Sequence, residues 1–253
     1  MSMMRTANPA LNNDAFSHVG RLLEGSRDSE TMTIQGTTNK TFVLLGLCLA
    51  TACYTWKLAY GPEAYLVGRM MMLGIFGGLI CALVTIFKKT AAPISAPLYA
   101  LFEGLAMGGI SAHFEARFPG IVIQAVGLTF GTLFALLAAY KSRIIQPSEN
   151  FKLGIAAATG AICLLYLVEM GIGFFGIRVP LIHESGLIGI GFSLFVVAIA
   201  AFNLVLDFDF IENGAAQGAP KYMEWYGAFG LMVTLIWLYL ELLRLLAKSR
   251  SRR

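Results

Sequence analysis

Four carboxylic side chains surround one short stretch of this chain. Asp207, Asp209 and Glu212 close a long apolar run within LeuAspPheAspPheIleGlu, and Glu224 follows after a loop whose only basic residue is Lys221. On a helix, positions 207 and 209 point about 200° apart, so these two carboxylates cannot share one proton. Asp209 and Glu212 are three residues apart and can lie on one face. The cluster indicates a site for protons or cations, and a solvated acidic loop is the alternative.

Clustered carboxylates offer oxygen ligands, which suit a hard cation such as Ca²⁺. Because crowded acids compete with protons, occupancy of such a site depends on pH. We therefore treat Asp207 and Asp209 as candidate Ca²⁺ ligands and expect no other cofactor. The three histidines are far apart and the four cysteines form no CxxC pair, so a zinc site is not expected.

Two further carboxylates, Glu103 and Glu169, fall inside apolar stretches, and neither has a basic residue near it in the same stretch. An ionisable residue within a membrane span is a functional-site hypothesis by default. Either side chain could carry a proton or line a cation path. The alternative is a neutral glutamic acid that is hydrogen-bonded to a neighbouring helix.

A third group combines acids with bases. Glu63 and Arg69 open one apolar run, whereas Glu241 and Arg244 lie near the end of the last run. If these helices run antiparallel, the two groups lie at a similar depth in the membrane, and their opposite charges predict the ion pairs Arg69–Glu241 or Glu63–Arg244. Such pairs would form an ion-pair clamp that closes one end of the bundle, or they would form a gate. Glu241 and Arg244 are also three residues apart, so they are neighbours on one helix face.

The elements that position these groups follow from composition. The chain has 253 residues, of which 57% are hydrophobic and 13% charged. Soluble domains have about 45–50% apolar and about 25% charged residues, so the apolar excess must face lipid. A net charge of +4 is too small to indicate nucleic acid as a partner. The composition excludes a soluble enzyme and predicts contact with a lipid bilayer.

Apolar blocks separated by short polar segments predict seven membrane spans. Continuous apolar runs favour helices, because lipid requires every backbone polar group to be satisfied within its own segment. The fold class is therefore all-α, a polytopic membrane helix bundle with seven transmembrane helices. The expected spans are residues 41–60, 65–87, 95–113, 118–140, 152–175, 185–206 and 225–246.

The same pattern divides the chain into three parts. Residues 1–39 are predicted to be a polar, largely mobile tail with one short amphipathic helix near residues 16–23. Residues 40–247 form the bundle, and residues 248–253 form a basic tail. Three glycine pairs at i, i+4 predict close helix approach in the second, third and fourth spans. They are Gly74 with Gly78, Gly104 with Gly108, and Gly127 with Gly131.

Basic residues near the span ends indicate orientation. Loops on the N-terminal side carry Lys88, Lys89, Lys141, Arg143, Lys152 and Lys221, whereas the opposite loops carry Lys57, Arg117 and Arg178. This asymmetry predicts a multi-pass protein of the cell (inner) membrane with a cytoplasmic N-terminus. The basic C-terminal tail would then lie outside; an even number of crossings, with one re-entrant segment, is the alternative.

Several motifs resemble the Bax inhibitor-1 (transmembrane Bax inhibitor motif) family, in its prokaryotic branch with a polar N-terminal tail. They are MetArgThrAlaAsnProAla near the start, AlaLeuPheGluGlyLeuAlaMetGlyGlyIleSer, LeuAspPheAspPheIleGlu, LysTyrMetGluTrpTyrGlyAlaPheGly and LeuTyrLeuGluLeuLeuArgLeuLeu. Together they cover nearly the whole chain. The third motif and the final stretch are the most specific.

The resemblance implies a bundle with the last helix near its centre and a pH-sensitive calcium leak. In the family, an aspartate ending span six pairs with an aspartate in span seven, and Asp207 or Asp209 matches the first position. The second position aligns with Leu231 or Met232, and residues 225–240 contain no carboxylate. Glu224 or Glu103 could substitute. Arg244 matches a basic position that pairs with an acid on span two, for which Glu63 is the candidate.

These observations support two functions. The first is a pH-sensitive Ca²⁺ leak channel, gated by carboxylates at the junction of spans six and seven, with Ca²⁺ or protons as permeant or regulating ions. The alternative is a membrane interaction module that regulates another membrane protein, such as a protease, without transport. We do not expect an enzyme, because HExxH and GxSxG motifs are absent and serines such as Ser193 have no base near them in sequence.

Overall fold

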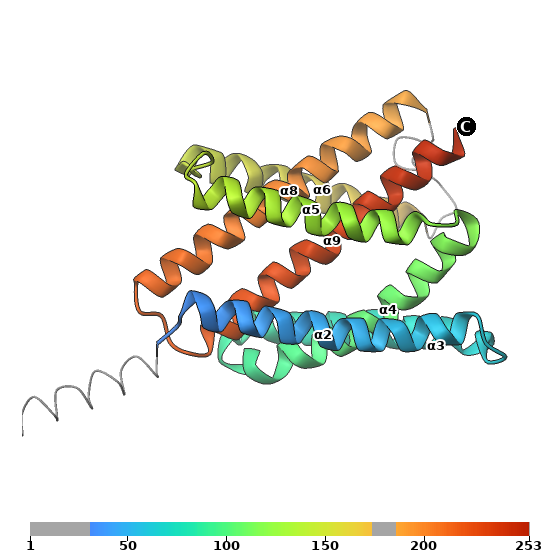
Figure 1. Ribbon diagram of the computed structural model, residues 1–253, viewed down its shortest axis with the longest axis horizontal. Helices are drawn as coiled ribbons and strands as arrows, with labels where there is room; N and C mark the ends of the chain where they lie inside the picture. The colour runs from blue at the N-terminus through green and yellow to red at the C-terminus, as the bar shows by residue number, and fades with distance from the viewer. Residues whose placement is uncertain (1–30, 174–185, 253) are drawn as a thin grey trace, which may run out of the picture.

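The computed structural model describes residues 31–173 and 186–252. Within these residues the chain is a bundle of long helices (Figure 1), which confirms the all-α membrane fold. The long helices are α2 (Ile34–Ala59), α3 (Val67–Phe87), α4 (Ala92–Arg117), α5 (Ile121–Lys141), α6 (Glu149–Gly173), α8 (Leu187–Ala216) and α9 (Met223–Ser251). Two short 3-10 helices, η1 (Ala64–Leu66) and η2 (Lys89–Ala91), precede α3 and α4.

The outermost boundaries of the bundle differ from the predicted ones. The hydroxyl of Thr33 accepts a hydrogen bond from the amide of Gly36 at 2.9 Å, so Thr33 caps α2 and the helix begins at Ile34. Residues 34–39 therefore belong to the bundle rather than to the tail. At the other end α9 continues to Ser251, so most of the predicted basic tail is helical. The amphipathic helix predicted near residues 16–23 lies outside the described residues.

Helix α9 lies near the centre of the bundle, as the family resemblance implies. It packs against α2, α4, α5 and α8, and side chains along it, such as Met232 and Leu238, are fully buried. Its central place means that many groups on α9 face other helices rather than lipid, although Val233 is 37% exposed. Any charged or polar group there must find its partners within the protein.

Six of the seven long helices are long and apolar enough to cross a bilayer. The exception, α4, lies against α2 and α3 and buries a series of small residues, including Ala96, Ala100 and Gly104. Because α4 is covered by neighbouring helices, less of its surface faces lipid, and it needs fewer large apolar side chains. The lipid-facing helices carry such side chains outward: Phe42 is 68% exposed and Ile123 is 71% exposed.

Two of the three glycine pairs make the predicted close helix contacts. A Cβ atom added at Gly104 would lie 2.2 Å from the carbonyl oxygen of Cys48 on α2, and one at Gly74 would lie 2.5 Å from the carbonyl oxygen of Phe102 on α4. The prediction is wrong for Gly127 and Gly131, because no atom lies within 4 Å of a Cβ added at either position. That face of α5 is open, so its glycines serve no helix contact within the described chain.

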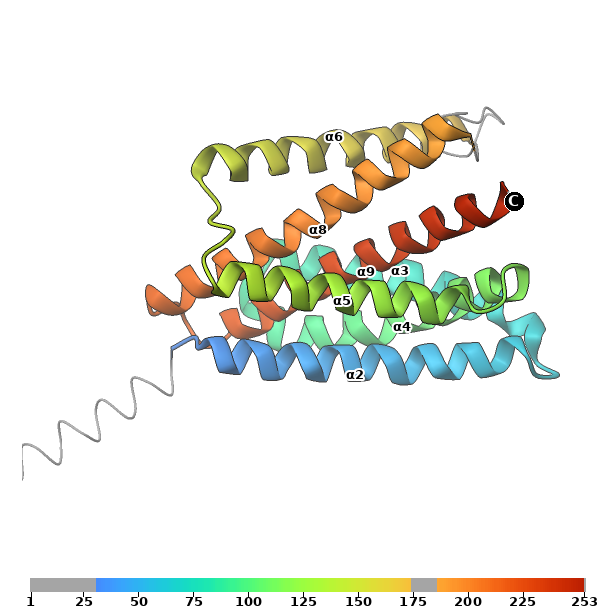
Figure 2. The same cartoon turned by 45° about the horizontal axis from the view of Figure 1, so that its top comes forward.

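The described chain starts and ends at opposite ends of the bundle. Figures 1 and 2 both show the first turn of α2 at one end and the last turn of α9 at the other. This arrangement agrees with an odd number of crossings rather than with the alternative that has an even number. Which end faces the cytoplasm stays a prediction from the lysines and arginines.

Candidate functional site

Asp207 lies in the last third of α8 and faces the centre of α9. The hydroxyl group of Thr234 donates a hydrogen bond to its carboxylate. Its Oδ2 atom is buried and has no hydrogen-bond partner among the residues that the structure describes. Leaving a buried polar atom unsatisfied costs about 1–3 kcal/mol. Asp207 is therefore a buried acid that the surrounding protein only partly satisfies.

The surface of α9 opposite Asp207 is formed by Gly230 and Thr234. These residues are four positions apart and so share one face of the helix. A Cβ atom at Gly230 would lie 3.9 Å from Oδ1 of Asp207, so the glycine leaves this carboxylate room beside the α9 backbone. Leu231, one of the two positions that align with the family's second aspartate, packs in a cluster that contains Leu204 and Phe208 of α8. Met232 instead packs with Leu44 on the side of α2 and α4.

The other two acids of α8 point to different helices. Oδ2 of Asp209 forms an ion pair with Lys152 of α6 at 2.8 Å, whereas Glu212 accepts a hydrogen bond from the hydroxyl of Tyr140 on α5. The separation of Asp207 from Asp209 agrees with the helical angle expected between them. It does not support joint Ca²⁺ binding by the pair. The described residues contain no group of three or more His, Cys, Asp or Glu that could hold a metal ion.

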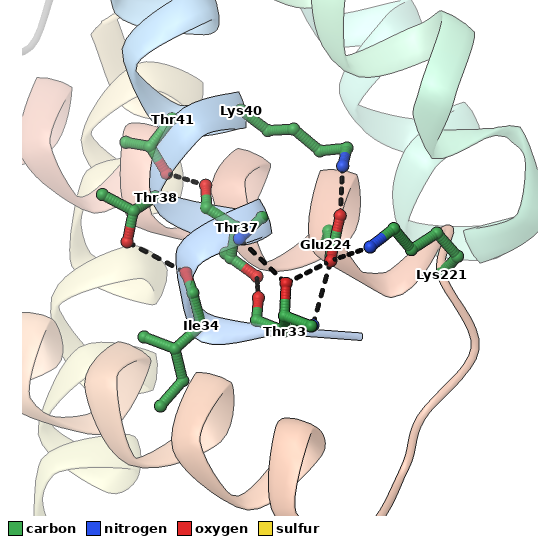
Figure 3. Close-up of polar contacts among 9 residues, drawn as sticks. Thr33, Ile34, Thr37, Thr38, Lys40, Thr41, Lys221 and Glu224 are labelled. Carbon is green, nitrogen blue, oxygen red and sulfur yellow. Dashed lines mark hydrogen bonds and ion pairs between the residues drawn. The ribbon is translucent and has the colours of Figure 1, made fainter. Parts of the chain in front are cut away.

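Glu224 lies in the first turn of α9 and is 0% exposed (Figure 3). Its Oε1 atom accepts hydrogen bonds from the amide and the hydroxyl of Thr33, at 2.9 and 2.8 Å. The carboxylate also forms ion pairs with Lys221, at 2.8 Å, and with Lys40 of α2. Glu224 is thus fully engaged in joining the start of α2 to the start of α9. It is not free to replace the family's second aspartate.

The segment before α2 reinforces this junction. The amide of Met32 donates to the carbonyl oxygen of Ala219 at 2.6 Å, and Thr31 forms an isolated antiparallel bridge with Pro220. Sequence reasoning missed Thr33 and Lys40 as partners of Glu224. The available signal was weak: Lys40 is a lone base at the start of an apolar run.

Glu103 belongs to a separate site among α2, α3 and α4. It is hydrogen-bonded to Tyr99, one turn earlier on α4, and its Oε2 atom would lie 3.1 Å from a Cβ at Gly78 of α3. The ring of Tyr99 in turn packs edge-on against Phe229 of α9, with ring centroids 5.0 Å apart. Aromatic rings therefore lie on the side of Glu103 that faces α9, and the structure does not bring Glu103 and Asp207 into one cluster.

The predicted clamp is wrong in its partners. Glu241 is 1% exposed and pairs with Arg244 of its own helix at 2.8 Å, as their spacing allowed. It also accepts a hydrogen bond from the hydroxyl of Tyr166 on α6 at 3.0 Å. Glu63 and Arg69 are exposed and take part in neither pair. The physical reason is that α3 packs on α4 and α2, so its start does not reach the end of α9.

Glu169 and Lys248 lie near one another at the same end of the bundle, close enough for an electrostatic interaction. The ammonium group of Lys248 donates to the hydroxyl of Ser193 at 2.8 Å and to the carbonyl oxygen of Gly189 at 3.1 Å. Ser193 thus has a base beside it that its sequence neighbourhood did not indicate. Because Ser193 is only 3% exposed, the pair serves to tie α9 to α8.

Comparison with known proteins gives one match. A family model described as "Bax inhibitor 1 like" matches residues 8–251, nearly the whole chain. No curated protein and no solved structure matches the chain.

Proposed function

This chain belongs to the Bax inhibitor 1 like family, and from that premise we propose that it is a pH-sensitive cation leak of the membrane, with Ca²⁺ as the main permeant ion. The gating group in this proposal is the Asp207 carboxylate between α8 and α9. The family resemblance supports this class of function, and the surroundings of Asp207 support the choice of residue.

The observation that carries the proposal is the unsatisfied Oδ2 atom of Asp207. A buried carboxylate that is ionised and lacks a counter-ion is strongly unfavourable in a medium of low dielectric. A proton or a passing cation would supply what the protein does not. Occupancy by one excludes the other, so acidity and cation binding compete at this atom.

Thr234 gives the proposed gate a distinct chemistry. In the pattern that the family resemblance implies, an aspartate on the last span opposes the aspartate of span six; in this chain Thr234 is the residue hydrogen-bonded to Asp207. A threonine hydroxyl can donate to either protonation state of the acid, but it does not titrate. The gate would therefore respond to a single proton, and its pH dependence would be shallow.

The remaining acids have secondary roles in this proposal. Asp209 and Glu212 lie closer to the end of α8 and already have partners, Lys152 and Tyr140. They would bring cations toward the end of the helix rather than gate their passage. Glu103 lies at a separate site among α2, α3 and α4 and Glu169 lies near Lys248, so neither has a role at the gate in this proposal.

The test is calcium flux into liposomes that contain the reconstituted protein and an enclosed calcium dye. We expect flux to change between mildly acidic and mildly alkaline pH in the wild type, and this pH dependence to be lost in Asp207→Asn. Asp209→Asn is the matched control, because it removes the same charge from the same helix but leaves Asp207 and Thr234 in place.

Two results would contradict the proposal. Flux whose pH dependence is the same in wild type and Asp207→Asn would show that another group gates the pore. No flux at any pH would favour the alternative, an interaction module that regulates another membrane protein without transport.

A further inference from the structure

A groove of about 750 Å³ opens on the side of the bundle between α2 and α5. Its walls include Phe42 and Leu45 of α2 and Leu133 and Phe134 of α5, and its floor is formed by Phe208 and Leu231. Phe42 and Phe134 are 68% and 61% exposed, so the groove borders the lipid-facing surface. The volume lies in the range of small-molecule sites, about 300–1,000 Å³. The proposed gate, the Asp207 carboxylate, does not line this space, although Asp209 and Glu212 do.

One end of the groove is charged. It is lined there by Lys141, Arg143, Asp209 and Glu212, at the end of the bundle where α5 ends and α2 begins. We call these four residues the mouth. An apolar trough with a charged mouth at one membrane face matches an amphiphile that stands parallel to the helices.

The charges at the mouth are unequally paired. Asp209 forms an ion pair with Lys152. Glu212 has a neutral partner, the hydroxyl of Tyr140. Lys141 and Arg143 form no ion pair within the described part of the chain. The mouth therefore offers two cations and one carboxylate to a ligand.

The loop that carries Arg143 is held in a defined shape. The amides of Ile144 and Ile145 both donate to the carbonyl oxygen of Ala139, at 3.0 and 3.2 Å. Arg143 itself has a left-handed backbone, with φ of 58°, a conformation that is uncommon outside glycine. Ile144 is 79% exposed beside it. Apolar and basic side chains thus meet at this end of the bundle.

The headgroup must decide which lipid binds. An acyl chain gains little by leaving the bilayer for an apolar groove, because lipid tails are as apolar as the groove itself. Charge-assisted hydrogen bonds at the mouth are the selective interactions. Two cations suit a phosphate, and the Glu212 carboxylate suits a primary ammonium but repels a purely anionic headgroup.

We propose that this groove binds an aminophospholipid, with one acyl chain between α2 and α5, the phosphate at Lys141 and Arg143, and the primary ammonium at Glu212. The proposal is independent of ion transport. It concerns a groove on the side of the bundle that Asp207 and Thr234 do not line, although its floor residues Phe208 and Leu231 are sequence neighbours of Asp207 and Gly230.

Native mass spectrometry of the full-length protein, delipidated in detergent, tests this assignment. Phosphatidylethanolamine, phosphatidylglycerol and phosphatidylcholine with the same acyl chains are added separately. We expect phosphatidylethanolamine to bind about tenfold more tightly than the other two, the difference made by one charge-assisted hydrogen bond. Phosphatidylcholine lacks the N–H donors, and phosphatidylglycerol lacks the positive charge.

Variants separate the parts of the site. Glu212→Gln should remove the preference for phosphatidylethanolamine over phosphatidylcholine. The double variant Lys141→Gln/Arg143→Gln should weaken the binding of all three lipids. Lys88→Gln is a matched control, an exposed lysine between α3 and α4 that the groove does not include. Thr38→Trp should fill the groove and weaken the binding of all three lipids. Leu49→Trp, which lies on α2 outside the groove, should leave lipid binding unchanged.

Three results would overturn the proposal. Equal binding of the three lipids would show that the mouth does not select a headgroup. Tightest binding of phosphatidylglycerol, strengthened by Glu212→Gln, would assign the groove to an anionic lipid instead. Binding that is insensitive to Thr38→Trp would place the lipid elsewhere on the bundle.

Discussion

Glu224 and Thr33 are 191 residues apart in the chain, yet the Glu224 carboxylate accepts hydrogen bonds from both the amide and the hydroxyl of Thr33. Thr33 also caps α2, and Glu224 lies in the first turn of α9. One carboxylate therefore sets the starting points of the first described helix and the last (Figure 3). The side chain leaves no room for a larger residue at Gly36, where an added Cβ would overlap it.

Glu224→Gln should destabilise the bundle. The amide can still accept from Thr33, but Lys40 and Lys221 lose their anionic partner, and Lys40 is only 19% exposed. We expect a loss of about 1–3 kcal/mol in the free energy of unfolding, measured by denaturation in detergent micelles. Glu149→Gln is the control: this acid is 88% exposed in its pair with Lys152, and exposed pairs contribute about 0–1 kcal/mol. Equal effects of the two changes would contradict a structural role for Glu224.

Thr234→Asp should steepen the pH dependence of calcium flux. The change places a second titratable carboxylate opposite Asp207, so two interacting protons replace one. Thr234→Val keeps the shape of the side chain while removing the hydroxyl that Asp207 contacts, and should alter flux without steepening its pH dependence. Liposome flux at a series of pH values compares the three proteins. A pH profile of the same slope in wild type and Thr234→Asp would argue against this site as the gate.

Gly104→Ala should destabilise the protein, whereas Gly127→Ala should not. At Gly104 the new methyl group would overlap Cys48 and Thr51 of α2, at 2.2 and 2.0 Å, and at Gly127 it would meet nothing within 4 Å. Forcing atoms into a tightly packed contact costs about 1–3 kcal/mol, and open surface positions stay within about 0.5 kcal/mol. Thermal unfolding of the two variants in the same detergent measures the difference. A comparable loss at both positions would mean that α5 has a partner at that face.

Glu241→Gln and Arg69→Gln distinguish the observed ion pair from the predicted clamp. Glu241 is buried and contacts Arg244 and Tyr166, so its neutralisation should cost about 1–3 kcal/mol. Arg69 is exposed, and its replacement should have little effect on stability. The two single variants and the double variant form a cycle in chemical denaturation. A coupling energy well above zero between positions 69 and 241 would show that the predicted Arg69–Glu241 ion pair forms after all.

The fold followed from the sequence wherever a single helix was enough to decide it. Long apolar runs predicted the helices, and the opposed directions of Asp207 and Asp209 followed from the helical angle alone. The i, i+3 pairing of Glu241 with Arg244 followed in the same way. The start of α2 at Ile34 was missed because residues 35–39 are polar, so they were assigned to the tail, although the Thr33 hydroxyl caps the helix locally and Thr33 also contacts Glu224.

Contacts between helices were harder to predict. Gly104 and Gly127 lie in the same kind of motif, but only Gly104 has a neighbouring helix at its face. Alignment along α9 placed the family's second aspartate at Leu231 or Met232, and only the packed structure shows that Thr234 is the α9 side chain hydrogen-bonded to Asp207. A one-residue change along a helix turns a side chain by about 100°, so small errors of register change the partner completely.

The amino-acid sequence by itself determined that this protein is a bundle of membrane helices, because the free energy of placing an apolar segment in lipid depends on local composition. It also determined which carboxylates are unusual, since acids within apolar runs stand out without any structure. Only the tertiary structure decided what each acid does. The Oδ2 atom of Asp207 has no hydrogen-bond partner among the described residues, and Glu224 joins α2 to α9 through its hydrogen bonds to Thr33. Glu212 lies at the mouth of the groove. The surroundings of a carboxylate are set by helix rotation and packing, which bring together residues that are far apart in the chain.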